Sequence, residues 1–160
     1  MAKSIKTPKK LHVMHDLSEV NQEILPLKAL ADRELASIYG LTGKVYTPHI
    51  DEYMQVCIKK AAIVDCLKKQ GYIPRSDVEV ISAALDFLHP RARTNAVFEY
   101  QGAQYQRRFA PLKLSKSGKN VQKWAKFWLL QLPNGNIDPN WELEVREIWP
   151  SYFLIRAIDI

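Results

Sequence analysis

The sequence predicts an α+β protein in which a helical N-terminal half packs against a C-terminal antiparallel β-sheet. Up to about residue 90, apolar residues recur at intervals of three and four, which is the spacing of one helix face. Beyond residue 96, short apolar runs are separated by glycine-containing turns, which is typical of strands. Because helices come first and strands second, the pattern favours a segregated fold over an alternating α/β fold.

The first two helices are predicted on either side of Pro26. Residues 17–24 have helical spacing, and Pro26 is expected to interrupt the helix because proline lacks an N–H and clashes with the preceding turn. Residues 27–39 repeat the spacing, and Gly40 is a typical stop after a helix. We therefore expect two short helices here.

Two further helices have clear start signals. Thr47 is a good N-cap and Pro48 suits the first helical position, so a long helix is predicted to run to Lys69 and to end before Gly71. Ser76 and Glu79 have the spacing of a capping box and predict a shorter helix that His89-Pro90 closes.

Residues 30–42 leave two interpretations open. Ala36 and Gly40, followed by the helix from Thr47, are typical of a DNA-reading helix-turn-helix. The connection is longer than the usual turn of three or four residues, and Asp51 and Glu52 near the start of the second helix would face phosphates. These departures favour an ordinary helical hairpin.

The second half is predicted to be mainly β. The pattern predicts two strands, at residues 96–100 and 103–109, around Gly102. It predicts a strand or loop at residues 111–119 and a further apolar segment at residues 124–132. Trp141, Leu143 and Val145 alternate with polar residues, which predicts a half-buried strand. We expect its glutamates, Glu142 and Glu144, to pair with lysines across the sheet or to form an acidic edge. Residues 152–158 are predicted as a last strand.

Composition and targeting signals set the class of protein. Charged residues are 25% and hydrophobic residues 47% of the chain, which excludes disordered and low-complexity classes. We expect one domain at 11–160, helical over 17–89 and mainly β over 96–160, after a flexible basic arm at 1–10. The chain has no apolar run long enough for a membrane helix or a signal peptide. Its two cysteines, Cys57 and Cys66, are too far apart on one predicted helix to form a disulfide. These features predict a cytoplasmic protein with no membrane partner.

The net charge of +6 is concentrated in one stretch. Residues 1–90 carry 12 basic and 11 acidic side chains, residues 91–126 carry nine and one, and residues 127–160 carry two and five. The three segments therefore have net charges of +1, +8 and −3. The nine cations of the central segment are Arg91, Arg93, Arg107, Arg108, Lys113, Lys116, Lys119, Lys123 and Lys126.

A non-enzymatic nucleic-acid-binding protein is the leading functional hypothesis. The nine cations would contact phosphates of DNA or RNA and release counterions. Interleaved aromatic residues could stack on bases, although alternation in residues 105–109 favours a core role for them. The small size and the absence of a catalytic motif are also compatible with an origin in a phage or mobile element.

Two alternatives remain open. The first is an adaptor or inhibitor whose basic face docks on an acidic protein partner, with Trp124, Trp128, Trp141 and Trp149 as anchors. The second is a metal-dependent nuclease, which would need a carboxylate cluster that the spacing does not display.

No cofactor, metal or catalytic residue is predicted. Residues 115–119 contain one glycine where a phosphate-binding loop needs two, in a different order. His12 and His15, followed by Asp16, could begin a metal site, but His49, His89, Cys57 and Cys66 have no spacing that would complete it, and a surface histidine pair is the favoured interpretation.

Overall fold

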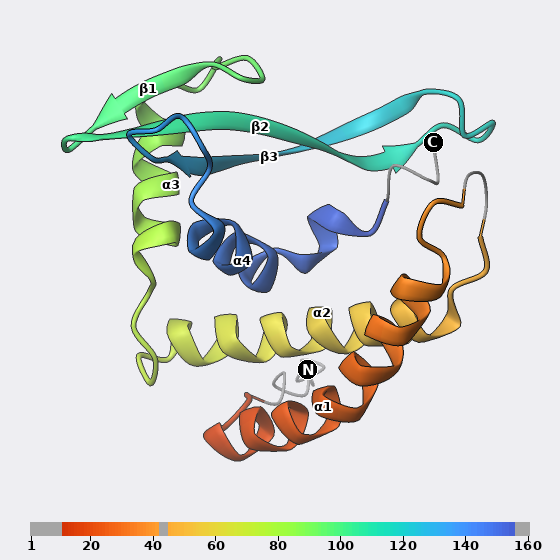
Figure 1. Cartoon of the computed structure of the whole chain (residues 1–160). Helices are drawn as coiled ribbons and strands as arrows, with labels where there is room; N and C mark the ends of the chain where they lie inside the picture. Colours follow the sequence, from red (N-terminus) through yellow and green to blue (C-terminus); the bar gives the residue numbers. More distant parts are fainter. Residues whose placement is uncertain (1–10, 42–44, 156–160) are drawn as a thin grey trace, which may run out of the picture.

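The structure, a computed structural model, describes residues 11–41 and 45–155, so the predicted basic arm at 1–10 lies outside the described residues. Its elements are α1 (Met14–Ser37), α2 (Pro48–Lys69), α3 (Asp77–Leu88), β1 (Val97–Tyr100), β2 (Ala103–Leu114), β3 (Val121–Gln131), α4 (Pro139–Ile148) and the 3-10 helix η1 (Pro150–Phe153). Figure 1 shows the sheet on one side, α4 and η1 beneath it, and α2 and α1 on the opposite side. The fold class is α+β, as predicted.

The predicted break at Pro26 is wrong, because α1 continues from Met14 to Ser37 as one helix (Figure 1). Its apolar positions Leu17, Val20, Ile24, Leu27 and Ala31 are spaced three, four, three and four residues apart. This stripe crosses Pro26 without a change of phase, and its first four members pack in the cluster shared with α2. Packing of the stripe therefore outweighs the loss of one backbone hydrogen bond at the proline.

α1 and α2 form an ordinary helical hairpin. Val20 of α1 is buried with Val56, Ile63 and Leu67 of α2. The carboxylate of Glu34 in α1 accepts hydrogen bonds from the backbone N–H groups of His49 (3.2 Å) and Ile50 (3.0 Å). The N-terminus of α2, which a recognition helix would direct at DNA, is thus occupied by a side chain of α1.

The two helices with clear start signals are confirmed. α2 begins at Pro48 and ends at Lys69 with Gln70 as its C-cap. Ser76 caps α3, because its hydroxyl oxygen accepts the N–H of Glu79 at 3.4 Å. The sequence signals at these helix ends are local, so they are visible without knowledge of the tertiary fold.

The sheet has the strand order β1-β2-β3 with antiparallel pairs throughout. The predicted hairpin around Gly102 is confirmed, and Gly102 has a φ of 80°, the left-handed region in which glycine is unstrained. β1 is short and pairs with β2 only as far as Gln106, whereas β2 and β3 pair over almost their full length. Beyond Arg107 the sheet is therefore a two-stranded ribbon.

The larger hydrophobic core lies between the sheet, α3 and α4. Trp128 of β3 has no exposed surface, and it is buried together with Leu85 of α3 and Val145 of α4. Tyr105 and Trp141 pack ring against ring at 5.3 Å in the same cluster. The helical hairpin has its own smaller core, and α2 connects the two by packing on η1 and α4.

The predicted strand at 141–146 is wrong, because these residues form α4. The Asp138 carboxylate accepts the N–H of Asn140 at 2.9 Å, and Pro139 occupies the first helical position. Trp141 and Val145 are buried, but Leu143 between them is 61% exposed. The apolar period is therefore four, not two, and Glu142 pairs with Arg146 on α4 instead of facing a strand lysine.

The predicted last strand is also wrong over its described part. Residues 150–153 form η1, and residues 156–158 lie outside the described residues. Pro150 fixes the first position of the 3-10 helix, and the Phe153 ring packs on Phe127 of β3 with a centroid separation of 5.2 Å. Within the described residues, no helix is long and apolar enough to cross a membrane.

Candidate functional site

The β2–β3 ribbon ends in a tight turn at Ser115–Asn120. The backbone N–H of Ser115 donates to the carbonyl of Asn120 at 2.8 Å, and the N–H of Gly118 donates to the carbonyl of Ser115 at 2.9 Å. Gly118 has a φ of 73°, so the turn needs a residue that tolerates the left-handed region. We call residues 113–123 the ribbon tip.

Four lysines gather at the ribbon tip. Lys113 and Lys123 are directly opposite each other in the register of β2 and β3, and Lys116 and Lys119 lie in the turn. All four, which we call the tip lysines, are exposed. Because like charges opposite each other in a sheet destabilise it, the cluster has a cost for folding.

The tip lysines have no ion-pair partner among residues 11–41 and 45–155. Some cations elsewhere in the same part of the chain are paired, such as Lys59 with Glu23 at 3.3 Å and Lys69 with Asp65 at 3.0 Å. Glu142 and Glu144 were expected on a strand beside the lysines, but they belong to the helix α4, where Glu142 pairs with Arg146. The positive charge of the ribbon tip is therefore left for a partner or for solvent.

Aromatic and cationic side chains continue from the ribbon tip along the strands. The ammonium of Lys126 lies 5.5 Å from the centre of the Phe109 ring, within range of a cation–π interaction. Trp124 lies 6.5 Å from the same ring and is 48% exposed. Arg108 is half-buried, and its Nε donates to Oε1 of Gln106 at 2.8 Å.

Arg107 differs from the other eight predicted cations because it is buried. It is 4% exposed, and its Nη1 lies 2.7 Å from Oδ1 of Asp86 in α3. Its guanidinium also lies 4.7 Å from the centre of the Trp128 ring. These contacts hold Arg107 in the core, where an external phosphate cannot reach it.

Arg91 and Arg93 are exposed but lie far from the ribbon tip. They belong to the loop between α3 and β1, and the end of that loop pairs with β2 at Arg107, where the N–H of Asn95 donates to the Arg107 carbonyl at 2.7 Å. Ser115 lies eight positions beyond Arg107, which is about 26 Å along the strand at about 3.3 Å per residue. The nine predicted cations therefore do not form one face.

The four tryptophans predicted as anchors for a protein partner have different environments. Trp128 and Trp141 are buried, and the indole N–H of Trp141 donates to the Trp128 carbonyl at 2.9 Å. Trp149 is half-buried and stacks on Tyr152 at 5.9 Å. Trp124 is the most exposed of the four, with about half of its surface accessible.

No cluster of three or more potential metal ligands occurs among the described residues. His12 contacts Asp16 (3.3 Å) and His15 contacts Glu19 (2.9 Å), each one turn along α1. Cys57 and Cys66 are free and half-buried, and burial raises the pKa of the Cys57 thiol. A two-metal nuclease centre is therefore not visible in the described part of the chain.

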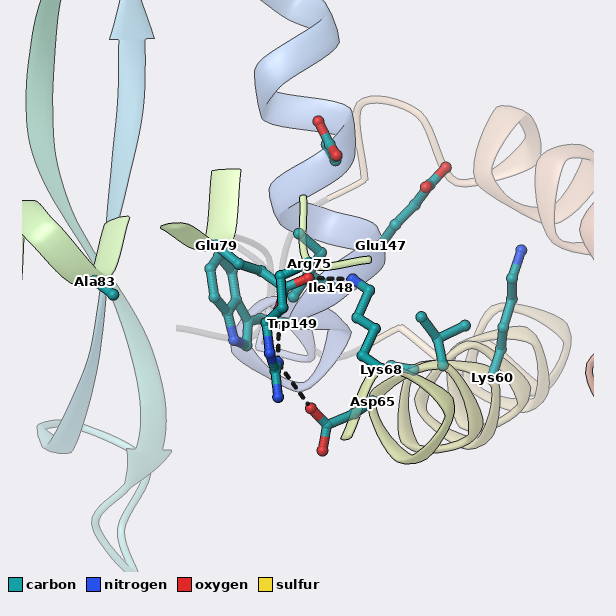
Figure 2. Close-up of a pocket in the computed structure, with 12 residues that line it drawn as sticks. Lys60, Asp65, Lys68, Arg75, Glu79, Ala83, Glu147, Ile148 and Trp149 are labelled. Atoms are coloured by element: carbon teal, nitrogen blue, oxygen red, sulfur yellow. Dashed lines mark hydrogen bonds and ion pairs between the residues drawn. The ribbon is translucent and has the colours of Figure 1, made fainter. Parts of the chain in front are cut away.

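A hollow of about 620 Å³ lies between α2, α3 and α4 (Figure 2). Lys68 and Glu79 form an ion pair there, and both side chains are about nine-tenths buried. Arg75 contacts Glu79 at 2.8 Å and Asp65 at 3.3 Å. Burial alone would raise the pKa of Glu79, but the hydrogen bonds and charges of Lys68 and Arg75 outweigh it and lower that pKa. Because these charges satisfy one another, the network joins α2 to α3.

The sequence predicts neither the hollow with its Lys68–Glu79 ion pair nor the Asp86–Arg107 pair. Each joins residues that are more than ten positions apart, and no local spacing indicates such contacts. Comparison of the chain with protein-family models, with curated proteins and with solved structures finds no match.

Proposed function

We propose that the protein binds double-stranded DNA through the ribbon tip and that it does so without chemistry on the DNA. The observation that carries this proposal is the cluster of four exposed lysines at the end of a two-stranded ribbon, without ion-pair partners among the described residues. Lys126 and Arg108 add positive charge further along the ribbon, on its opposite faces, because Lys126 pairs with Phe109 and Arg108 with Phe127.

Electrostatics supports a phosphate partner. Lys113 and Lys123 repel each other across the strands, so the folded ribbon gains when an anion lies between or beside them. Each phosphate neutralised by a lysine also releases condensed counterions from the duplex, which favours binding at low salt. A cluster that is unfavourable in the free protein becomes favourable in the complex.

The shape of the ribbon supports a duplex of B-form. The major groove of B-DNA, about 12 Å wide, admits a two-stranded β-ribbon, whereas the major groove of A-form RNA is too deep and narrow for side chains to read. Beyond Arg107 the ribbon consists of β2 and β3 alone, so β1 does not obstruct its approach. Trp124, near the ribbon tip, offers an apolar surface for sugar or base contacts.

The test is replacement of all four tip lysines by glutamine, with binding to a labelled DNA duplex followed by fluorescence anisotropy over a salt series. A matched control replaces Lys28, Arg33, Lys59 and Lys69, all exposed on α1 and α2, so that the net charge changes equally. We expect the slope of log affinity against log salt to fall by about 0.9 for each lost contact, or about three to four in total, in the tip variant alone. Equal losses in the two variants would refute the assignment to the ribbon tip.

Competition experiments test the class of partner. We expect duplex DNA to compete better than single-stranded DNA, duplex RNA, heparin or polyglutamate at the same charge concentration. Equal competition by heparin or polyglutamate would favour an adaptor that recognises acidic surfaces, and preference for single strands would favour base stacking on Trp124. Cleavage of the duplex with Mg²⁺ that chelation abolishes would overturn the non-enzymatic part of the proposal.

A further inference from the structure

The helix α3 is apolar on the side that faces away from the core. Its core side buries Val78, Ser82 and Leu85. On the opposite side, Val80 is 56% exposed and Phe87 is 86% exposed, with the exposed Ala83 between them. Figure 1 shows α3 at the left edge of the molecule, running from the end of α2 to the sheet. Glu79 and Asp86 of α3 are held in ion pairs with Lys68 and Arg107, which leaves Val80 and Phe87 as an exposed apolar face of the kind that binds a partner.

We infer that a second copy of the chain covers this face, with the two α3 helices antiparallel about a two-fold axis. Val80 and Phe87 are seven residues apart, so they lie on the same helix face two turns apart. The midpoint between them falls between Ala83 and Ala84. An axis through this point places Val80 of one copy opposite Phe87 of the second copy and brings only small side chains together at the centre.

Charged residues at the two ends of α3 indicate which partner covers its exposed apolar face. Asp77 is exposed at the N-terminal end, and Arg91 and Arg93 are exposed just beyond the C-terminal end. None of the three has an ion-pair partner among the described residues. In the antiparallel pair, Asp77 of each copy lies at the end that carries Arg91 and Arg93 of the other, and the two helix dipoles oppose each other.

This self-complementarity favours a second copy over a lipid surface. An anionic membrane would attract Arg91 and Arg93 but repel Asp77, whereas an antiparallel second copy offers each of these charges a partner of opposite sign. A single helix face is smaller than the standard interface of about 800 Å² per partner, so we expect weak association, with a dissociation constant in the micromolar range.

The first test measures molecular mass by sedimentation over a concentration series, without nucleic acid. We expect the wild-type chain to pass from monomer to dimer as concentration rises and Phe87→Glu to remain a monomer. Leu143→Glu is the matched control, because Leu143 is an exposed leucine on α4, 61% accessible, away from the proposed axis. A wild-type chain that stays monomeric up to about 1 mM, or a Phe87→Glu variant that dimerises normally, overturns the inference.

The second test exchanges the charges. Asp77→Arg alone and the pair Arg91→Asp with Arg93→Asp should each weaken the dimer, and the three changes together should restore it. Failure of the combined variant to recover the association of the wild type overturns the antiparallel arrangement. Because neither test uses nucleic acid, its outcome is independent of binding at the ribbon tip.

Discussion

The guanidinium of Arg107 in β2 lies 2.7 Å from the carboxylate of Asp86 in α3, and this ion pair joins the sheet to the helix. The same carboxylate oxygen accepts the indole N–H of Trp128 at 2.9 Å. Arg107 is almost completely buried, but the Asp86 side chain is 55% exposed. One exposed carboxylate therefore neutralises a buried cation and satisfies a buried indole donor in the core.

Removal of this carboxylate should destabilise the fold. We expect Asp86→Ala to lower the free energy of unfolding by about 2 kcal/mol, less than the roughly 3–5 kcal/mol of a fully buried pair because Asp86 is solvated. Urea unfolding measures the change. Asp32→Ala, which removes an exposed carboxylate from α1, should change stability by less than about 0.5 kcal/mol.

A second substitution at Arg107 distinguishes an unpaired charge from lost packing. In the Asp86→Ala background, Arg107→Met removes the uncompensated cation while keeping a long apolar side chain over Trp128. We expect the double variant to recover part of the lost stability. A double variant less stable than Asp86→Ala alone would show that the guanidinium stabilises the core without its partner.

The ion pair between Lys68 and Glu79 predicts a loss of stability in acid. The pKa of Glu79 in the folded protein is below its ordinary value near 4.5, so the unfolded chain takes up the proton first as pH falls. The stabilising contribution is present in full above that ordinary value, and it is lost as pH falls through the folded pKa.

Glu79→Gln should remove this pH dependence. Urea unfolding between about pH 3 and pH 7 should show a stability difference between the wild type and the variant that shrinks as pH falls. The pKa of Asp65 is also lowered, through hydrogen bonds from Lys69 and Arg75, so Asp65→Asn serves as the comparison for an exposed carboxylate. A difference that stays constant over this range would contradict the pKa direction.

Local signals explain which elements were predictable from sequence. The ends of α2 and α3 and the hairpin around Gly102 depend on caps and turns within a few residues. α4 was not predicted because Trp141, Leu143 and Val145 alternate as in a strand, and only the tertiary fold shows that Leu143 faces solvent. The cap at Asp138-Pro139 was a signal that could have identified the helix.

The candidate site was predictable as a charged segment but not as a surface. The tip lysines are close in sequence and share one hairpin, so their grouping follows from the turn between the strands. Arg107 is close to them in sequence, but it contacts Asp86, 21 residues before it. Whether a cation is free or buried depends on such distant partners, which charge counting does not include.

The assignment of α4 predicts different effects at two neighbouring apolar positions. Val145 has no exposed surface, so Val145→Ala should lower the free energy of unfolding by about 2 kcal/mol. Leu143 is 61% exposed, so Leu143→Ala should cost less than about 0.5 kcal/mol. A strand with both side chains on its buried face would give comparable losses, and thermal or urea unfolding of the two variants decides between the two structures.

Pro26 is exposed in the interior of α1, and its replacement should stabilise the protein. Proline in a helix interior costs about 3 kcal/mol relative to alanine, while its restriction of the unfolded chain returns up to about 1 kcal/mol. We therefore expect Pro26→Ala to raise the free energy of unfolding by about 2 kcal/mol, with a higher Tm. Leu25→Ala, at a neighbouring position that is 69% exposed, is the control and should be nearly neutral. A Pro26→Ala variant less stable than the wild type would mean that the stripe from Leu17 to Ala31 needs the proline's geometry to pack on α2.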